Sequence, residues 1–350
     1  MDLDKAQAIC DTLRFVYDNT AIDIQGGEPT LYTSIVPLLE HCRAIGLTPT
    51  LISNALLLAD RERCRRLHEA GLYDFLLSIQ GIGETYDRIV GVPGGSVKQM
   101  QALDNLIALG IPFRFNIVLS RLALPQLPAL ADLAVEAGAR VVNFLTFNPF
   151  EDQAQTGKRS TENVPSYTDV AGPLVAALDF LETHGVEANV RYFPLCMAPE
   201  RHRKSLYNFQ QLPYDSHEWD YASWSWTGLQ PQRMRGGAPS RPPKLRDETY
   251  RRIRGFYEVF PELDTAPHAE RDPLIYRDNA RRRAGTDCKY RYGPACDSCA
   301  AQAICDGFHG DYAAIFGLDE ATAIAAPAPI DDPTHYIRHQ RKLVEPFDDP

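Results

Sequence analysis

The sequence predicts an α/β fold built on parallel strands, and two observations carry that prediction. From the N-terminus to about residue 185, short strand-like runs alternate with amphipathic helical stretches, and successive strands start roughly 25–40 residues apart. Several of the runs are apolar almost throughout, as in FLLSI and RVVNFLTF. Strands of that kind have both faces buried, which is typical of a parallel sheet covered by helices.

The elements follow one another in strict alternation. Strands are expected at residues 21–25, 48–52, 74–79, 113–119, 140–147 and 186–193. Helices are expected between them at residues 35–45, 61–70, 97–109, 126–136 and 167–183. In such folds the loops at the carboxyl ends of the strands carry the chemistry, so functional residues are sought there.

Composition and charge exclude several functional classes. The chain has 350 residues, enough for about two domains, and its 46 acidic and 36 basic residues give a net charge of −10. That sign argues against coating nucleic acid or an anionic membrane. No apolar run approaches the roughly 18 residues of a membrane helix, and the first residues lack the pattern of a signal peptide. A cytoplasmic location is therefore expected.

Small polar residues and glycines stand at the end of each predicted strand. The first strand leads into Gly26-Gly27-Glu28-Pro29, where two glycines leave backbone groups open to a ligand. A simple tight turn is the alternative for that tetrapeptide, and a helix cap is the alternative for any single Asn or Ser. Five consecutive strand ends of this kind favour a polar ligand cradle; the others carry Ser53 and Asn54, Ser78, Asn116, and Asn143 with Asn148.

These strand ends carry a family resemblance. The segments IDIQGGEPTL, LISNALLL, DFLLSIQG and RFNIVLS resemble the radical S-adenosylmethionine (radical SAM) enzymes over about residues 1–150. The resemblance implies a partial, TIM-like (β/α)6 barrel in which GGEP follows the second strand, so that the first strand is missing here. It also implies that Gly26, Gly27, Glu28 and Pro29 contact the methionine part of S-adenosylmethionine. Ser53 and Asn54 would lie near that part, and Ser78 and Asn116 near the ribose and carboxylate.

The chain departs from that family before the GGEP motif. The family binds its catalytic [4Fe–4S] cluster through Cys-x3-Cys-x2-Cys, whereas only Cys10 precedes Gly26 here, in a helical stretch. Two interpretations follow: the chain as given starts late, or the protein has lost the radical-initiating cluster. The first is favoured because a barrel without its first strand leaves an unpaired edge.

The one cluster of cysteines in the sequence lies near the C-terminus. Half of the eight cysteines fall between residues 288 and 305, with a core of Cys296-x2-Cys299-x5-Cys305. In a reducing cytosol such spacing indicates metal binding more than disulfides. The thiolates alone suit either Zn²⁺ or an iron–sulfur cluster.

The C-terminal motif resembles the auxiliary-cluster segment of SPASM and Twitch extensions, Cys-x2-Cys-x5-Cys-x3-Cys. His309 stands where the fourth cysteine would be, so the resemblance implies one auxiliary [4Fe–4S] cluster. Cys196, which ends the predicted strand in RYFPLC, is the preferred fourth ligand. Cys288 is the second choice, and an open iron or His309 the third.

Three regions are therefore expected. They are a partial barrel at residues 1–185, an auxiliary iron–sulfur domain at 186–320, and a weakly structured tail at 321–350. The middle region includes an aromatic-rich insertion at 200–245 that contains all three tryptophans. Packing of a small subdomain is favoured for this insertion over a flap that faces the substrate.

By resemblance, the activity is reductive cleavage of S-adenosylmethionine and hydrogen abstraction from a substrate. The implied cofactors are S-adenosylmethionine, the auxiliary [4Fe–4S] cluster and, if the preceding segment exists, a second [4Fe–4S] cluster. The implied partners are a small-molecule or peptide substrate and an electron donor such as flavodoxin or ferredoxin. Two alternatives remain: a non-catalytic iron–sulfur or partner protein with a degenerate barrel, and a zinc-stapled α/β protein.

Overall fold

One parallel sheet organises the part of the chain that the computed structural model describes, namely residues 1–16, 19–147, 158–208, 210–211, 285 and 289–343. Within these residues seven strands pair in sequence order, each parallel to the next. The strands are β1 (Ala21–Ile24), β2 (Thr48–Ser53), β3 (Asp74–Ser78), β4 (Phe113–Val118), β5 (Val141–Leu145), β6 (Glu187–Arg191) and β7 (Leu206–Tyr207).

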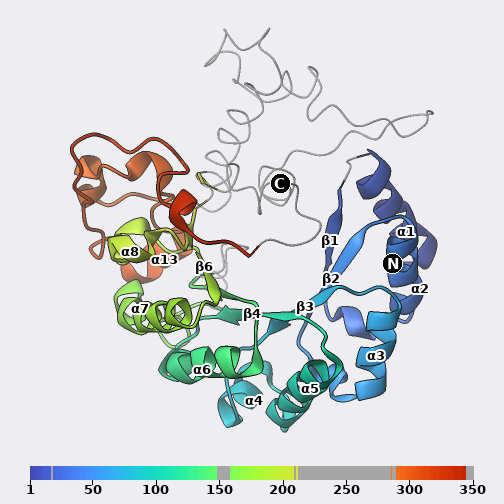
Figure 1. The fold of residues 1–350 in the computed structure, drawn as a ribbon. Coiled ribbons are helices and arrows are strands. Elements are labelled where there is room, and N and C mark those ends of the chain that lie inside the picture. The colour runs from blue at the N-terminus through green and yellow to red at the C-terminus, as the bar shows by residue number, and fades with distance from the viewer. Residues whose placement is uncertain (17–18, 148–157, 209, 212–284, 286–288, 344–350) are drawn as a thin grey trace, which may run out of the picture.

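The sheet curls into a half-barrel with the helices on its convex side (Figure 1). The larger helices are α1 (Leu3–Asp11), α2 (Ile35–Ala44), α3 (Arg61–Glu69), α4 (Glu84–Val90), α5 (Gly95–Leu109), α6 (Leu127–Ala137), α7 (Tyr167–Thr183), α8 (Glu200–Arg203) and α13 (Gly310–Phe316). Each predicted strand and helix forms within two residues of its expected ends. The predicted partial α/β barrel is therefore confirmed.

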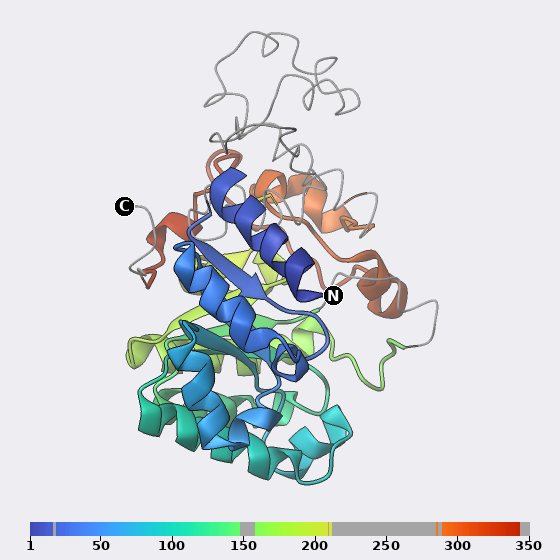
Figure 2. The ribbon, with the colours of Figure 1, turned by 90° about the vertical axis from the view of Figure 1, so that its right-hand side faces the viewer.

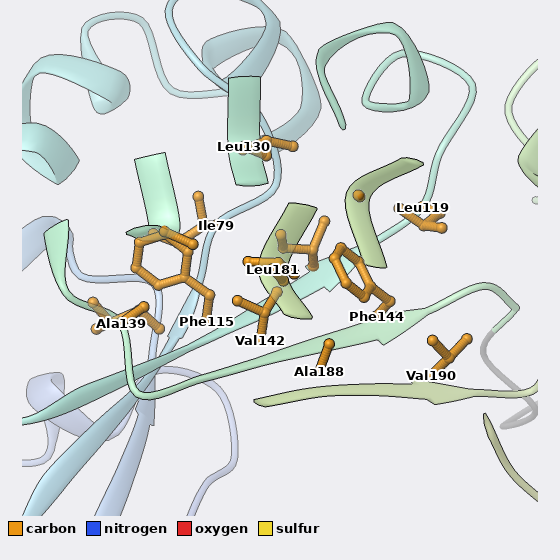
Figure 3. Packing of buried hydrophobic residues seen from close by; sticks show 14 of the residues in the cluster. Ile79, Phe115, Leu119, Leu130, Ala139, Val142, Phe144, Leu181, Ala188 and Val190 are labelled. Atoms are coloured by element: carbon orange, nitrogen blue, oxygen red, sulfur yellow. The ribbon is translucent and has the colours of Figure 1, made fainter. Parts of the chain in front are cut away.

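Alternation along the strands separates an apolar outer face from a polar inner face. Phe115, Val142 and Phe144 point outward and pack against the helices, where they meet Leu130 and Leu181 (Figure 3). All five are fully buried. Because successive strand side chains point to opposite faces, the residues between them line the inside of the half-barrel; on β4, β5 and β6 these include Arg114, Asn116, Asn143, Glu187 and Asn189.

Near the amino ends of the strands, the inner face is closed by an ion pair. Arg114 Nε donates to Asp74 Oδ2 at 2.7 Å, and its Nη2 reaches Thr50 Oγ1 at 3.2 Å. The Asp74 side chain is 1% exposed, so its charge requires this partner. Asp23 lies 3.8 Å from the same guanidinium. This network ties β2, β3 and β4 together on the inner face, and the predicted ligand residues lie toward the opposite, carboxyl ends of the strands.

At the N-terminal edge, α1 and α2 pack on the outer face of β1 (Figure 2). Ala6 and Cys10 from α1 meet Leu38 and Cys42 from α2 in a separate small core that also contacts Ile22 and Ile24. The first strand of the sheet is therefore covered on its convex side.

Beyond residue 185, the boundary predicted for the barrel, the sheet continues through β6 and β7. The two-residue strand β7 lies within the aromatic-rich stretch and is too short for periodicity to predict. Most of the insertion predicted at 200–245 lies outside the described residues.

Residues 289–343 pack beside α7 and α8 (Figure 1). The backbone N–H of Tyr167, the first residue of α7, donates to Tyr312 Oη at 2.6 Å, and the two rings stack 3.8 Å apart. Arg159 pairs with Asp311 at 3.1 Å, with both side chains buried. Because the start of α7 follows the carboxyl end of β5, these contacts hold the C-terminal region at the functional end of the sheet. Among the described residues, the helices are too short or too polar to span a bilayer.

Candidate functional site

The loop after β1 owes its shape to two glycines. Gly26 and Gly27 have φ values of +111° and +53°, in the region that side chains with a Cβ rarely adopt. A Cβ built on either one meets nothing within 4 Å, so the backbone conformation and not crowding requires glycine. Pro29 then begins the short 3₁₀ helix Pro29–Leu31. The peptide groups of the glycines are thereby left uncovered.

The Glu28 carboxylate joins the ends of β1 and β2. Its Oε1 accepts from Ser53 Oγ at 2.8 Å and from the Thr30 N–H at 3.0 Å. Its Oε2 accepts from the Asn54 N–H at 2.8 Å. Both oxygens are thus used within the chain. Glu28 sets the geometry of the two loops, and the groups left for a ligand are the neighbouring backbone groups.

The end of β2 carries a strained turn. Ala55 is fully buried with φ of +67°, an uncommon conformation for alanine. Ser53 Oγ accepts from the Ala55 N–H at 3.0 Å, and Asn54 Oδ1 accepts from the Leu56 N–H at 3.0 Å. Observed strain of this kind accumulates at ligand sites, where surrounding contacts hold it in place.

Two residues that the sequence did not single out fasten the ends of β2 and β3. Gln99 of α5 is fully buried, and its Nε2 donates to the carbonyl of Ser78 at 3.0 Å and to that of Asn54 at 3.4 Å. Tyr86 of α4 donates to the Asn54 carbonyl at 3.2 Å. Burial, followed by the charge of Glu28, raises the pKa of Tyr86 to about 12 and keeps it a donor. The available signal was a glutamine on the apolar stripe of α5, in line with Ala102, Leu103 and Leu106.

Strand register aligns a row of polar residues across the inner face. Ser78 pairs with Asn116, Asn116 with Asn143, and Asn143 with Asn189. Asn189 Nδ2 also donates to Asn143 Oδ1 at 3.1 Å. The predicted residues Ser78 and Asn116 are therefore neighbours, and Asn189 extends the row to β6, where the sequence offered no motif. Asn148 lies outside the described residues.

Four cysteines line one pocket in the C-terminal half. Cys196, which follows β6, faces the same space as Cys296, Cys299 and Cys305. Apolar side chains, among them Leu195, Phe308 and Ile324, complete the lining of this pocket. The fold thus brings together the four cysteines selected as metal ligands, although about 100 residues separate the first from the others. Cys288 lies outside the described residues.

Two features of the surroundings act in opposite directions on the ionisation of these thiols: burial opposes it, and hydrogen bonds to sulfur favour it. Burial raises the pKa of Cys305 to about 12, and it also raises the pKa of Cys196 and Cys296. The Gly307 N–H, however, donates to Cys305 Sγ at 3.4 Å, and the Ile324 N–H donates to Cys299 Sγ at 3.3 Å. Hydrogen bonds to sulfur are characteristic of iron–sulfur sites, where the metal charge compensates the buried thiolates.

The four-thiol pocket is the place where the sequence predicts a metal centre. In the described part of the chain, no three Cys, His, Asp or Glu side chains are grouped closely enough to hold one metal ion. His309 is absent from the pocket wall, and its Nδ1 accepts from the Asp311 N–H at 3.0 Å as the cap of α13.

Cys10 is placed away from both sites. It lies 3.6 Å, sulfur to sulfur, from Cys42 on α2, and both residues are buried between the helices. The only cysteine before the GGEP motif is therefore a packing residue in this structure.

Comparison with known proteins finds a family match for the first third of the chain. Residues 1–122 match the family model described as the radical SAM superfamily. The curated relatives include several proteins named PqqA peptide cyclase, of which two are described here. That of Rhodopseudomonas palustris is 36% identical over 119 residues, covering 34% of this chain and 31% of its own length. That of Methylobacterium nodulans is 32% identical over 149 residues, covering 40% and 39%. The chain thus spans 31% to 39% of the length of these relatives.

Solved structures show partial likenesses. Streptococcus suis SuiB aligns with a TM-score of 0.44 at 22% identity, covering 53% of this chain and 42% of SuiB. The protein anSMEcpe, solved with AdoMet and a Cp18Cys peptide, aligns with a TM-score of 0.43 at 20% identity, covering 55% and 56%.

Proposed function

Since residues 1–122 match the family model described as the radical SAM superfamily, we propose that this chain binds S-adenosylmethionine at the carboxyl ends of β1 to β4. With one electron from a reduced [4Fe–4S] cluster, the bound S-adenosylmethionine would give methionine and a 5′-deoxyadenosyl radical, which could abstract hydrogen from a substrate. The observation that carries the proposal is the Glu28 carboxylate. It joins the GGEP loop to Ser53 and Asn54 and so builds one continuous rim from two strand ends.

The chain's own residues would position the nucleoside and exclude water. The open peptide groups of Gly26 and Gly27 suit the polar methionine end of the ligand. The paired residues Ser78 and Asn116 suit the ribose hydroxyls, since a serine hydroxyl and an asparagine amide can both donate and accept. The row of Asn143 and Asn189 would face the substrate.

Cys196, Cys296, Cys299 and Cys305 would hold one auxiliary [4Fe–4S] cluster. Four thiolates complete the ligand set of such a cluster, which favours transfer of an electron over direct binding of substrate. The support for this assignment is that all four cysteines line one pocket. A flavodoxin or ferredoxin would serve as electron donor.

We propose a peptide as the substrate. The support is the name shared by the curated relatives, PqqA peptide cyclase, at 30–36% identity over 119 to 149 residues. The row of amide side chains inside the half-barrel offers the donors and acceptors that pair with peptide groups.

Binding of S-adenosylmethionine tests this function directly. The purified, reconstituted chain is titrated with S-adenosylmethionine by calorimetry under anaerobic conditions, and then assayed with dithionite for 5′-deoxyadenosine. Saturable binding at one site is expected. A folded chain that does not bind the nucleoside would contradict the proposal.

A second candidate is a non-catalytic iron–sulfur protein that binds S-adenosylmethionine without cleaving it. The observation in its favour is Cys10, which is buried against Cys42 and leaves residues 1–25 without cluster ligands. Binding without 5′-deoxyadenosine formation, by the chain together with any sequence encoded directly upstream, would select this candidate.

A further inference from the structure

The segment Gln340–Leu343 runs into the half-barrel and crosses the inner side of β6 and β7 (Figure 1, red). It follows the short 3₁₀ helix Ile337–His339, which Tyr336 anchors through a hydrogen bond from Arg203 at 3.3 Å. The strand residues beneath it are Glu187 and Asn189. They face inward, because Ala188 and Val190 point to the helices (Figure 3).

Glu187 is the centre of the contact. Its side chain is only 9% exposed, and its carboxylate receives three donors. Oε1 accepts from Asn189 Nδ2 at 3.0 Å and from Lys342 Nζ at 3.3 Å, while Oε2 accepts from the Leu343 N–H at 2.6 Å. Two of the three donors, Lys342 Nζ and the Leu343 N–H, belong to residues 340–343. The charge of this buried carboxylate is therefore balanced by that segment.

The remaining contacts are also those of a bound peptide. Gln340 Nε2 donates to the Ala188 carbonyl at 2.7 Å, and Gln340 Oε1 accepts from Tyr207 Oη. The Lys342 ammonium lies 4.4 Å from the centre of the Tyr207 ring, a cation–π distance. A carboxylate, an amide and an aromatic face thus surround one lysine. We call Glu187, Asn189 and Tyr207 the lysine strip.

We propose that the lysine strip is a docking site for a peptide that carries a basic side chain, and that residues 340–343 are its occupant in this structure. The inference rests on the proposed function, in which the substrate is a peptide. It assigns to that peptide a cationic residue that Glu187 would bind. Asn189 belongs both to the strip and to the polar row that runs through Asn143 and Asn116 to Ser78. A peptide held by its lysine at the strip would extend along that row toward the nucleoside site.

Residues 340–343 would then compete with the substrate within one chain. A tethered segment has an effective concentration in the millimolar range, so it weakens the binding of a free peptide without any change in the strip. Removal of the segment is expected to expose Glu187 and to strengthen binding of a peptide with the same sequence.

The test uses fluorescein-labelled Arg-His-Gln-Arg-Lys-Leu, the sequence of residues 338–343, as the probe. Its affinity is measured by anisotropy for the full chain and for a variant that ends at His339, with neither S-adenosylmethionine nor a reductant present. The shortened chain is expected to bind about tenfold more tightly. Glu187→Gln in the shortened chain, or alanine in place of lysine in the probe, is expected to weaken binding about fivefold.

Two further variants keep the proposal open to refutation. If the shortened chain does not fold, Lys342→Ala in the full chain must raise the affinity for the probe, because it removes the ammonium of the occupant. Lys204→Ala, which breaks the exposed ion pair with Glu182, is the matched control and must leave the affinity unchanged. A folded shortened chain with unchanged affinity, or an insensitive Glu187→Gln, overturns the proposal. Because no turnover is measured, failure of radical chemistry would not affect the result.

Discussion

The strand-end site and the four-thiol pocket lie in the same chain but are held together in different ways. The strand ends are fixed by the sheet and by hydrogen bonds from Glu28 and Gln99. The thiol pocket is formed by irregular segments and short 3₁₀ helices, and burial opposes the ionisation of three of its thiols. The first site is thus preformed by the fold, whereas the second is expected to need its metal for stability.

The largest expected effect is on the thiol pocket. Cys299→Ala removes one of four ligands and is expected to lower iron and sulfide from about four of each per chain to less than one. Colorimetric assays on anaerobically reconstituted protein measure this. Cys64→Ala is the control, because Cys64 is a buried cysteine of the barrel whose Sγ donates to the Leu58 carbonyl. Equal iron in the two variants would refute the ligand assignment.

Glycines in the two regions sharpen the comparison. A Cβ on Gly307, which has φ of +81°, would lie 2.5 Å from the Arg291 carbonyl oxygen, whereas a Cβ on Gly27 has free space. Gly307→Ala is therefore expected to cost about 3 kcal/mol and Gly27→Ala about 1 kcal/mol. Thermal unfolding of both variants, followed by circular dichroism, measures the difference. A greater loss for Gly27→Ala would contradict this account.

Neutralising Glu28 should weaken the strand-end site alone. Glu28→Gln loses the charge that its four donors share, and we expect about tenfold weaker binding of S-adenosylmethionine, or about 1.4 kcal/mol. Calorimetry gives the affinity, and the iron content is expected to stay constant. Glu40→Gln, at an exposed position on α2, serves as the control.

The smallest expected effect concerns the spacing of two strand ends. Gln99→Leu removes the donor shared by Asn54 and Ser78, and we expect about threefold weaker binding of S-adenosylmethionine. Because the nucleoside spans both strand ends, binding of the shorter fragment methylthioadenosine should change less. Gln101→Leu, on the exposed side of the same helix, is the control. Equal losses for both ligands would indicate general destabilisation instead.

Features that depend on residues close together in the sequence could be predicted, whereas those that depend on tertiary contacts could not. The strand ends could be predicted because the βα rhythm orders them, and GGEP marks one of them locally. Gln99 and Asn189 could not, since their roles depend on helix packing and on register between strands 46 residues apart. Cys196 was selected from its position after a strand, but its proximity to Cys299 is a tertiary property. The position of Lys342 inside the half-barrel, next to Glu187, could not be predicted, because no sequence motif marks it.

Hydrogen exchange of the metal-free chain, measured with S-adenosylmethionine alone and with iron and sulfide alone, tests the central claim most directly. The account predicts that the nucleoside protects the amides at residues 26–30, 53–56 and 78–83 and leaves residues 294–308 unchanged. The metal is predicted to protect residues 194–197, 294–308 and 322–324 and to leave the strand ends unchanged. A nucleoside that protects none of the strand ends, or a metal that leaves the cysteine segments as labile as before, would contradict it.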